Sequence, residues 1–293
     1  YTINMSSDKL LKKVKQLREI TGVGFKDCKN AIDETKGDVE KSIELLRKKG
    51  IAKASKRMER VAFEGLVCIY EKDNKFSMIE INSETDFVAK NNEFINFGEE
   101  ISELALKNLG NMKDILISEM KNKKKVKDNL IDLMSKIGEK ITLRRSAFIG
   151  KDKSINFSYI HSSLKKNVGK LGVLLSLETT KSKKEILDLG KQLAMQIAAS
   201  SPLAIDKENL DHGILEKEKE IILEELKNSG KDTKIIDKIA MGKLNKFIEE
   251  TTLLNQEWIM EPKKRVKDII KGVAGKDKIE IKKFIRFKVG ERI

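Results

Sequence analysis

Hydrophobic residues recur every three or four positions along residues 8–50, and glycines divide them into three stripes. This spacing predicts three short helices, the third of them capped by Asp38. A basic stretch without such a pattern, residues 51–60, follows and predicts a domain boundary. The three apolar faces consist of Leu10, Leu11, Val14, Leu17 and Ile20, of Phe25, Cys28, Ala31 and Ile32, and of Val39, Ile43 and Leu46.

The next segment, residues 56–150, changes between strand and helix patterns. Short runs rich in apolar and β-favouring residues predict strands, and a charged stretch between the first two is typical of a hairpin. Longer segments with apolar residues at helical spacing predict helices, one of which should end at Gly138. The predicted elements are strands at Val61–Tyr70, Phe76–Ile81 and Ile141–Ile149, and helices at Phe94–Leu109 and Val126–Ile137.

Residues 151–293 repeat this order of elements. The clearest sign is Lys278-Ile-Glu-Ile-Lys-Lys, which parallels Lys140-Ile-Thr-Leu-Arg-Arg 138 positions earlier. An internal repeat of this kind predicts two related halves. The predicted elements of the second half are strands at Ile155–Ile160 and Leu171–Leu177, a helix at Glu185–Ala199 that Pro202 stops, and a strand after Lys278.

An insertion at about 206–251 interrupts the second half. Two apolar stripes with a break at Ser229-Gly230 predict two antiparallel helices of about 20 residues, each ~30 Å long. The chain is therefore expected to be an α+β protein: a three-helix N-terminal module, residues 5–55, then two related α+β halves, 56–150 and 151–293. Each half should pack helices on one face of a small antiparallel sheet, and the second should carry the helical hairpin.

The stretch Glu80–Lys90 joins a predicted strand to a predicted helix. Thr85, Asp86 and Phe87 lie at this junction, and loops held by rigid elements often carry function. Thr85 or Asp86 can also cap the helix that follows. The residues alone leave two interpretations of Phe87 open: a core side chain, or an exposed side chain that a partner covers.

The 293 residues include 60 Lys and Arg against 46 Asp and Glu, a net charge of +14. This excess permits an anionic partner but is also common on solvated helices, so it establishes none. Cys28 and Cys68 have neither the number nor the spacing of a disulfide framework or a metal site, which favours a reducing compartment. The longest apolar runs are too short to span a bilayer, so we expect no membrane association.

Candidate catalytic residues are few. His161 and His212 are the only histidines, and the nucleophile-elbow, zinc-protease and dinucleotide-binding motifs are all missing. Gly22 and Gly24 do not form a phosphate loop, because no strand precedes them and no Gly-Lys-Ser/Thr follows. We therefore expect a binding protein rather than an enzyme, with no cofactor and no metal.

Several motifs resemble those of one family. Asn82-x-x-Thr85-Asp86-Phe87-Val88-Ala89-Lys90 looks like the signature of elongation factor Ts, and Leu17-Arg-Glu-Ile-Thr-Gly-Val-Gly-Phe-Lys-Asp-Cys28 resembles the family's opening motif. The resemblance covers about residues 8–293, including the helical-hairpin, coiled-coil protrusion. Three more segments match in the family's order: Gln192-Leu-Ala-Met-Gln-Ile-Ala-Ala-Ser-Ser-Pro, Trp258-Ile-Met-Glu-Pro and Phe284-Ile-Arg-Phe-Lys-Val-Gly-Glu.

The resemblance implies a guanine-nucleotide exchange factor for the translational GTPase elongation factor Tu, which it would bind in GDP-bound and nucleotide-free states. The loop Thr85-Asp86-Phe87-Val88 is expected to enter the GTPase domain and to disturb the Mg²⁺–GDP site. The N-terminal module is expected to have a ubiquitin-associated-like fold and to pack on the same domain. Further partner contacts are expected from His161, Leu17, Arg18, Gly22, Gly24, Asp27 and Cys28.

The sequence departs from the family pattern at His161, and it also leaves an alternative function open. His161 lies in Ser158-Tyr-Ile-His-Ser, where the family usually has a His-Gly pair, so the resemblance does not fix the geometry of its loop. The alternative function is a basic RNA- or ribosome-associated binding protein, which predicts salt-dependent RNA affinity and no effect on nucleotide release. Because paired RNA-stacking aromatics are missing, we expect no direct nucleic-acid partner. The expected location is the bacterial cytoplasm or an organellar matrix.

Overall fold

The computed structural model describes residues 7–21, 25–42, 45–46, 64–150, 153–227 and 233–291. Contacts within the chain divide it into two compact units, Tyr1–Val61 and Ala62–Ile293. The predicted basic linker lies outside the described residues, as do Gly22, Gly24 and Ser229-Gly230. The boundary between the two halves of the larger unit stays a prediction.

The smaller unit contains α1 (Ser7–Thr21) and α2 (Phe25–Glu34), followed by helical residues where the third helix is expected. Gly37 takes a left-handed φ of 83° and donates its N–H to the Ile32 carbonyl at 2.7 Å, which ends α2 as predicted. The Asp38 carboxylate accepts from the Lys41 N–H at 3.1 Å, the predicted cap. The likeness to a ubiquitin-associated fold stays a prediction. The core of this unit is formed by Val14, Leu17, Cys28, Ala31, Ile32 and Leu46.

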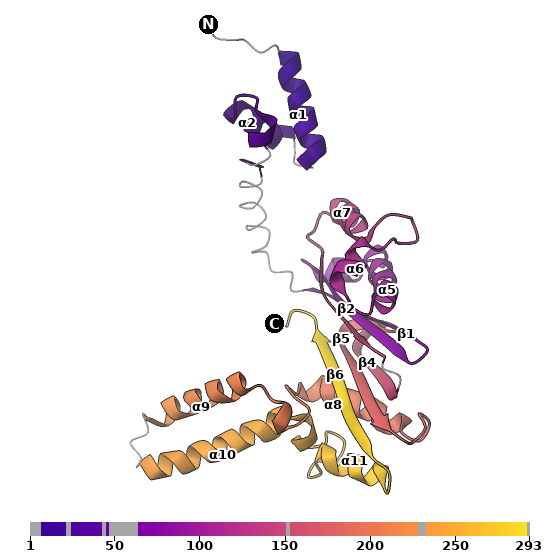
Figure 1. Cartoon of the computed structure of the whole chain (residues 1–293), viewed down its shortest axis with the longest axis vertical. Coiled ribbons are helices and arrows are strands. Elements are labelled where there is room, and N and C mark those ends of the chain that lie inside the picture. Colours follow the sequence, from indigo (N-terminus) through magenta and orange to yellow (C-terminus); the bar gives the residue numbers. More distant parts are fainter. Residues whose placement is uncertain are drawn as a thin grey trace. The chain divides into compact units, whose positions relative to one another are not determined.

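The larger unit is built on one antiparallel sheet (Figure 1). Its strands are β1 (Glu64–Lys72), β2 (Lys75–Ser83), β3 (Thr142–Ile149), β4 (Ser154–Lys165), β5 (Val168–Thr179) and β6 (Ile279–Lys288). The order is β3-β2-β1-β5-β4, and β6 also pairs with β5. The two predicted sheets are thus joined, because the first residues of β5 pair with β1 through Val67–Gly169 and Cys68–Val168.

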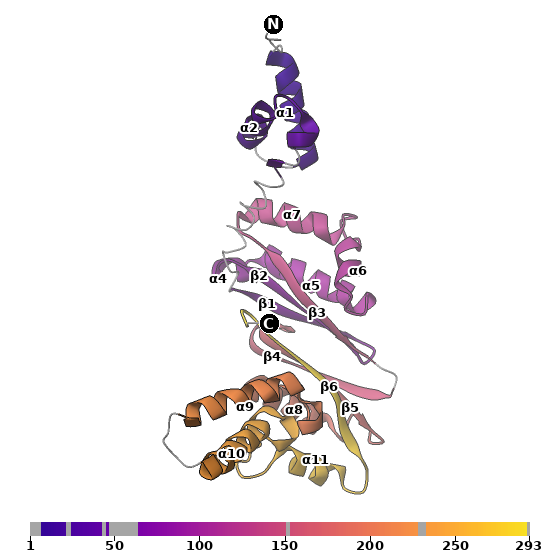
Figure 2. The same cartoon turned by 60° about the vertical axis from the view of Figure 1, so that its left-hand side comes forward.

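Each half of the joined sheet has a helix packed on one of its faces, and the other faces of the two halves pack against each other. Helix α5 (Asn92–Lys107) lies on β1 and β2, and α8 (Leu187–Ser200) lies on β4 and β5, as Figure 2 shows. The predicted arrangement of helices on one face of each half is therefore confirmed. The other faces share one apolar cluster, formed by Val67, Ile69, Phe76, Met78, Ile149, Leu174 and Phe287.

Strand β2 is buried on both faces from Phe76 to Ser83, although only four of its nine residues are apolar. Its side chains alternate between two clusters: Phe76 and Met78 join the cluster between the halves, and Ile79 and Ile81 join the cluster under α5. The short helices α4 (Asp86–Ala89) and α6 (Met112–Ile117) and helix α7 (Val126–Ile137) complete the first half. Helix α7 has its predicted bounds and ends at Gly138, whose φ is 81°.

The helical hairpin is formed by α9 (His212–Lys227) and α10 (Thr233–Thr251), which lie side by side in both views (Figures 1 and 2). It has an apolar cluster of its own, with Ile222, Leu226 and Ala240 at its centre, separate from the core under α8. The chain then passes through α11 (Val266–Ala274) into β6. No helix in the described part of the chain is both long and apolar enough to cross a membrane.

The internal repeat extends to a matching irregularity in the two halves. Between β2 and β3, Arg144 is an extra residue in the register, and between β5 and β6 Lys282 is extra. These β-bulges stand 138 positions apart, the spacing of the sequence repeat. In the first half the bulge brings Arg144 and Arg145 onto the same carboxylate, that of the fully buried Glu80.

Candidate functional site

The predicted site is a single helical turn at the end of a central strand. β2 ends at Ser83, Thr85 takes the N-cap position with extended backbone angles, and α4 begins at Asp86. Val88 and Ala89 are buried in the cluster under α5, whereas Phe87 is 79% exposed. The turn therefore docks through two small side chains and directs its one aromatic ring to solvent.

The exposure of Phe87 decides between the two interpretations left open by the sequence. The core interpretation is wrong, because the nearby Phe94 and Phe97 are buried in that core and Phe87 is not. The prediction that Phe87 is accessible in the free protein is confirmed. A large exposed apolar side chain contributes little to folding, and aromatic residues are enriched at the centres of protein interfaces.

The turn is held in place by hydrogen bonds to Glu139, a residue that follows the end of α7. Its carboxylate accepts the N–H groups of Glu84 and Thr85 at 3.1 and 3.0 Å, and the Thr85 hydroxyl at 2.6 Å. The Glu84 carboxylate in turn accepts the Lys140 N–H at 2.9 Å. The segments 84–85 and 139–140 thus clamp each other reciprocally, 54 to 56 residues apart in the chain.

The expectation that Thr85 or Asp86 caps the following helix needs correction. The Thr85 hydroxyl is engaged by Glu139 instead of the α4 backbone. The longer helix α5 is capped by Asn91, whose side-chain oxygen accepts from the N–H groups of Glu93 and Phe94 at 2.8 and 3.3 Å. The helix predicted at Phe94–Leu109 therefore begins two residues earlier, at Asn92, and α4 is a separate helix before it.

Charged groups surround the turn. Lys90 donates to the Asp86 carboxylate at 2.8 Å, one helical turn away, and both side chains are partly exposed. This hydrogen bond lowers the pKa of Asp86, and the same contact raises the pKa of Lys90. Asp86 is thus a carboxylate at neutral pH. A partner donor would compete with Lys90 for it, in a surface pair whose own contribution to stability is small.

His161 lies within β4 and not near a strand end, because β4 and β5 extend further than predicted on both sides of their turn. Its side chain is exposed, and its Nδ1 is 3.0 Å from the hydroxyl of Tyr159 on the same face of the strand. No described contact joins His161 to the Phe87 turn. Its role as a partner contact stays a prediction.

The residues predicted as contacts in the N-terminal unit differ in accessibility. Leu17 and Cys28 are fully buried in its core, so their side chains support the module rather than offer a surface. Asp27 is partly exposed, and Phe25, which was predicted on the apolar face of the second helix and not as a contact, is 42% exposed. The side chain of Arg18 lies outside the described residues, together with Gly22 and Gly24.

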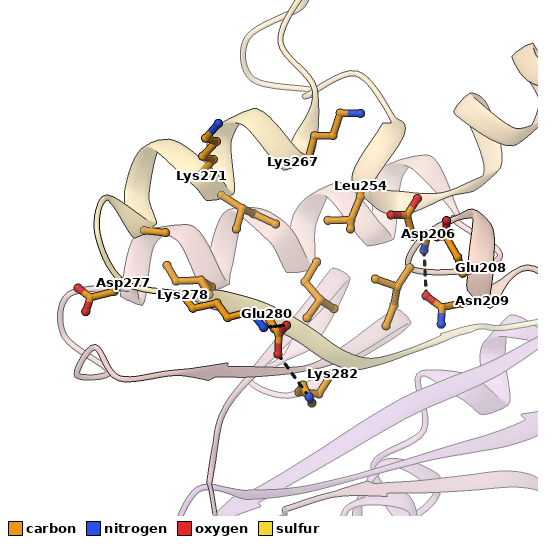
Figure 3. A pocket seen from close by; sticks show the side chains of 15 residues that line it. Asp206, Glu208, Asn209, Leu254, Lys267, Lys271, Asp277, Lys278, Glu280 and Lys282 are labelled. Atoms are coloured by element: carbon orange, nitrogen blue, oxygen red, sulfur yellow. Dashed lines mark hydrogen bonds and ion pairs between the residues drawn. The ribbon is translucent and has the colours of Figure 1, made fainter.

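A cleft of about 640 Å³ lies in the second half, between α11, β6 and the segment before the hairpin (Figure 3). Its floor is apolar, and charged side chains such as Lys267, Lys271 and Glu280 stand at its rim. On that rim Glu280 pairs with Lys278 and Lys282. None of the predicted site residues lines it. Among the described residues, no group of three or more His, Cys, Asp or Glu side chains could hold a metal ion.

Taken together, the fold and the turn define an α+β protein that presents one aromatic side chain on an anchored loop, as protein-binding proteins do. A sequence profile described as Elongation factor TS matches residues 84–291. The chain is 41% identical to Elongation factor Ts of Bartonella tribocorum over 285 residues, 96% of this chain and 92% of that protein. It is 40% identical to Elongation factor Ts of Methylorubrum populi and 37% identical to that of Maricaulis maris, over 96% of this chain and 92% and 91% of those proteins. The chain belongs to the elongation factor Ts family.

Proposed function

We propose that this chain promotes the release of GDP from elongation factor Tu by inserting the Phe87 turn into the GTPase domain. The observation that supports this proposal is the combination of a 79% exposed Phe87 with a turn fixed by Glu139. An aromatic ring that is already directed outward on an ordered turn can enter an apolar gap without first paying to leave a core.

In this mechanism Phe87 occupies the apolar gap between helices of the GTPase domain, and Asp86 accepts hydrogen bonds beside it. The helix that Phe87 displaces shifts the Mg²⁺ site that holds the phosphates of GDP, so GDP dissociates faster. Thr85 and Val88 complete the contact, with Thr85 held by Glu139 and Val88 docked in the core. His161, Arg18, Gly22, Gly24 and Asp27 provide further contacts, with Leu17 and Cys28 supporting them from the module core.

Thermodynamic linkage gives this mechanism a reciprocal form. If the factor weakens GDP binding by some ratio, GDP must weaken binding of the factor by the same ratio. The chain therefore binds nucleotide-free elongation factor Tu more tightly than the GDP-bound form. No covalent step is involved, and the site of action is the cytoplasm in which translation takes place.

The test is the rate of labelled-GDP release from elongation factor Tu, measured over a range of concentrations of this protein. Phe87→Ala should weaken the stimulation at subsaturating concentration by about thirtyfold, the effect of losing ~2 kcal/mol at an interface anchor. Its melting temperature should stay nearly unchanged, because Phe87 lies outside the core. The matched control is Ile131→Ala, which removes a 58% exposed apolar side chain from α7 and should leave release unchanged.

Two results would contradict the proposal. One is full stimulation of GDP release by Phe87→Ala at subsaturating concentration. The other is a wild-type chain that leaves GDP release at its spontaneous rate while binding RNA in a salt-dependent manner, which would support the RNA-associated alternative.

A further inference from the structure

The anchor that holds the Phe87 turn has a counterpart in the second half. Asp277 stands 138 positions after Glu139, the spacing of the sequence repeat. Its carboxylate accepts the hydroxyl of Thr180 at 3.0 Å and pairs with the Lys181 ammonium at 3.0 Å. Thr180 and Lys181 follow β5 as Glu84 and Thr85 follow β2. In both halves, a carboxylate beyond the last helix therefore holds the strand-to-helix junction.

The two junctions differ in what they present. Residues 180–185 of the second half read Thr-Lys-Ser-Lys-Lys-Glu, with no apolar side chain, whereas the first half places Phe87 two residues after the anchored Thr85. The anchor also differs in strength. Glu139 accepts two backbone N–H groups besides the hydroxyl, so it fixes the main chain immediately before α4. Asp277 contacts side chains of the junction.

We propose that Glu139 is a positioning residue for nucleotide exchange: it holds the Thr85–Val88 turn in the one conformation that presents Phe87 to the partner. This inference rests on the proposed function. Glu139 itself need not touch elongation factor Tu, because its contacts are made within the chain. Without it, the main chain at Glu84 and Thr85 loses two hydrogen bonds and the Thr85 hydroxyl loses a third, and the turn samples conformations in which Phe87 points elsewhere.

A positioning role makes a specific kinetic prediction. When only a fraction of molecules holds the competent conformation, the apparent dissociation constant rises by the inverse of that fraction. If Glu139→Ala leaves about one molecule in ten with the turn in place, half-maximal stimulation of GDP release shifts to about tenfold higher concentration. The maximal release rate at saturation stays the same, because a bound turn makes the same contacts with the partner.

The experiment compares Glu139→Ala, Glu139→Gln and Asp277→Ala with the wild-type chain in the GDP-release assay. Glu139→Gln keeps an acceptor oxygen and should shift half-maximal stimulation less than Glu139→Ala does. Asp277→Ala is the matched control, since it removes the same kind of anchor from the junction without an aromatic, and should shift nothing. Amide hydrogen exchange of the free proteins supplies an independent reading: the Glu84 and Thr85 N–H groups should exchange at least about tenfold faster in Glu139→Ala.

The possible outcomes separate this inference from the proposed function. Faster amide exchange at Glu84 and Thr85 with unchanged half-maximal stimulation would reject the positioning role and leave the proposed function intact. An equal shift in Asp277→Ala would also reject it, because the effect would not belong to the Phe87 turn. If Phe87→Ala stimulates release normally, both fall together. Should Glu139→Ala fail to fold, the same criteria apply to Glu139→Gln.

Discussion

The buried carboxylate of Glu80 provides the sharpest stability test of this fold. It has no exposed surface and accepts Arg144 Nη1 at 3.1 Å, Arg145 Nε at 2.6 Å and Asn82 Nδ2 at 3.0 Å. Replacing it by leucine removes the buried negative charge that both guanidinium groups share. Breaking a buried ion pair from one side costs ~3–5 kcal/mol, because the remaining charge stays uncompensated.

The surroundings place Glu80→Leu at the lower end of that range. Arg145 also contacts Glu291 at 3.5 Å, the Lys288 carbonyl at 3.2 Å and the Phe287 ring, whose centroid is 4.2 Å from its guanidinium carbon. Arg144 also donates to the Glu291 carbonyl. These contacts compensate part of the loss, so we expect a destabilisation of about 3 kcal/mol. For a unit of this size, that lowers the melting temperature by roughly 6–12 °C.

The assay is thermal and urea unfolding of Glu80→Leu followed by circular dichroism. The control is Lys282→Ala, which removes the equivalent bulge residue of the second half. Lys282 is 48% exposed and pairs with the exposed Glu178 and Glu280, so its loss should cost no more than ~1 kcal/mol. Equal losses in the two variants would show that burial of the Glu80 carboxylate does not decide the energetics of the bulge, and would refute this reasoning.

Two further predictions concern packing. Gly190→Ala should destabilise the larger unit by ~1–3 kcal/mol in urea unfolding, because an added Cβ would lie 2.4 Å from the buried Phe157 ring. In the control Gly242→Ala the added Cβ meets nothing within 4 Å and should stabilise α10 slightly. Equal effects of the two substitutions would mean that α8 shifts away from the sheet without cost. Replacing residues 217–242 by a short turn should preserve the cooperative thermal unfolding of the larger unit, because the hairpin has its own apolar cluster. Loss of the cooperative transition in calorimetry would show that the hairpin belongs to the core.

The elements that could be predicted from the sequence are those with local signals. Helix α7 has its predicted bounds because its apolar spacing is regular and Gly138 supplies the left-handed residue that ends it. A strand over Phe76–Ile81 requires Phe76 and Ile79 to lie on opposite faces, because side chains of a strand alternate, and the structure places them so. The related halves followed from the repeat, which the structure extends to the bulges at Arg144 and Lys282.

The features that could not be predicted depend on contacts between distant residues. Two residue pairs, Val67–Gly169 and Cys68–Val168, join the half-sheets, and pairing between strands a hundred residues apart has no local signature. The Glu139 anchor is similar, but a signal for it existed. The clearest match between the halves begins at Lys140 and Lys278, and one position earlier both halves carry a carboxylate, Glu139 and Asp277.

The comparison of the halves explains why Phe87 indicates function. Both junctions have the same topology and a carboxylate anchor, so stability of the fold can be achieved with the polar residues 180–185 of the second half. Burying a Phe side chain contributes ~1.5–3 kcal/mol, and the first half does not gain this because the ring stays in solvent. That free energy remains available to a partner that covers the ring. In an anchored turn most of this free energy contributes to binding affinity, because the conformational entropy of the turn is lost when the chain folds and not when it binds.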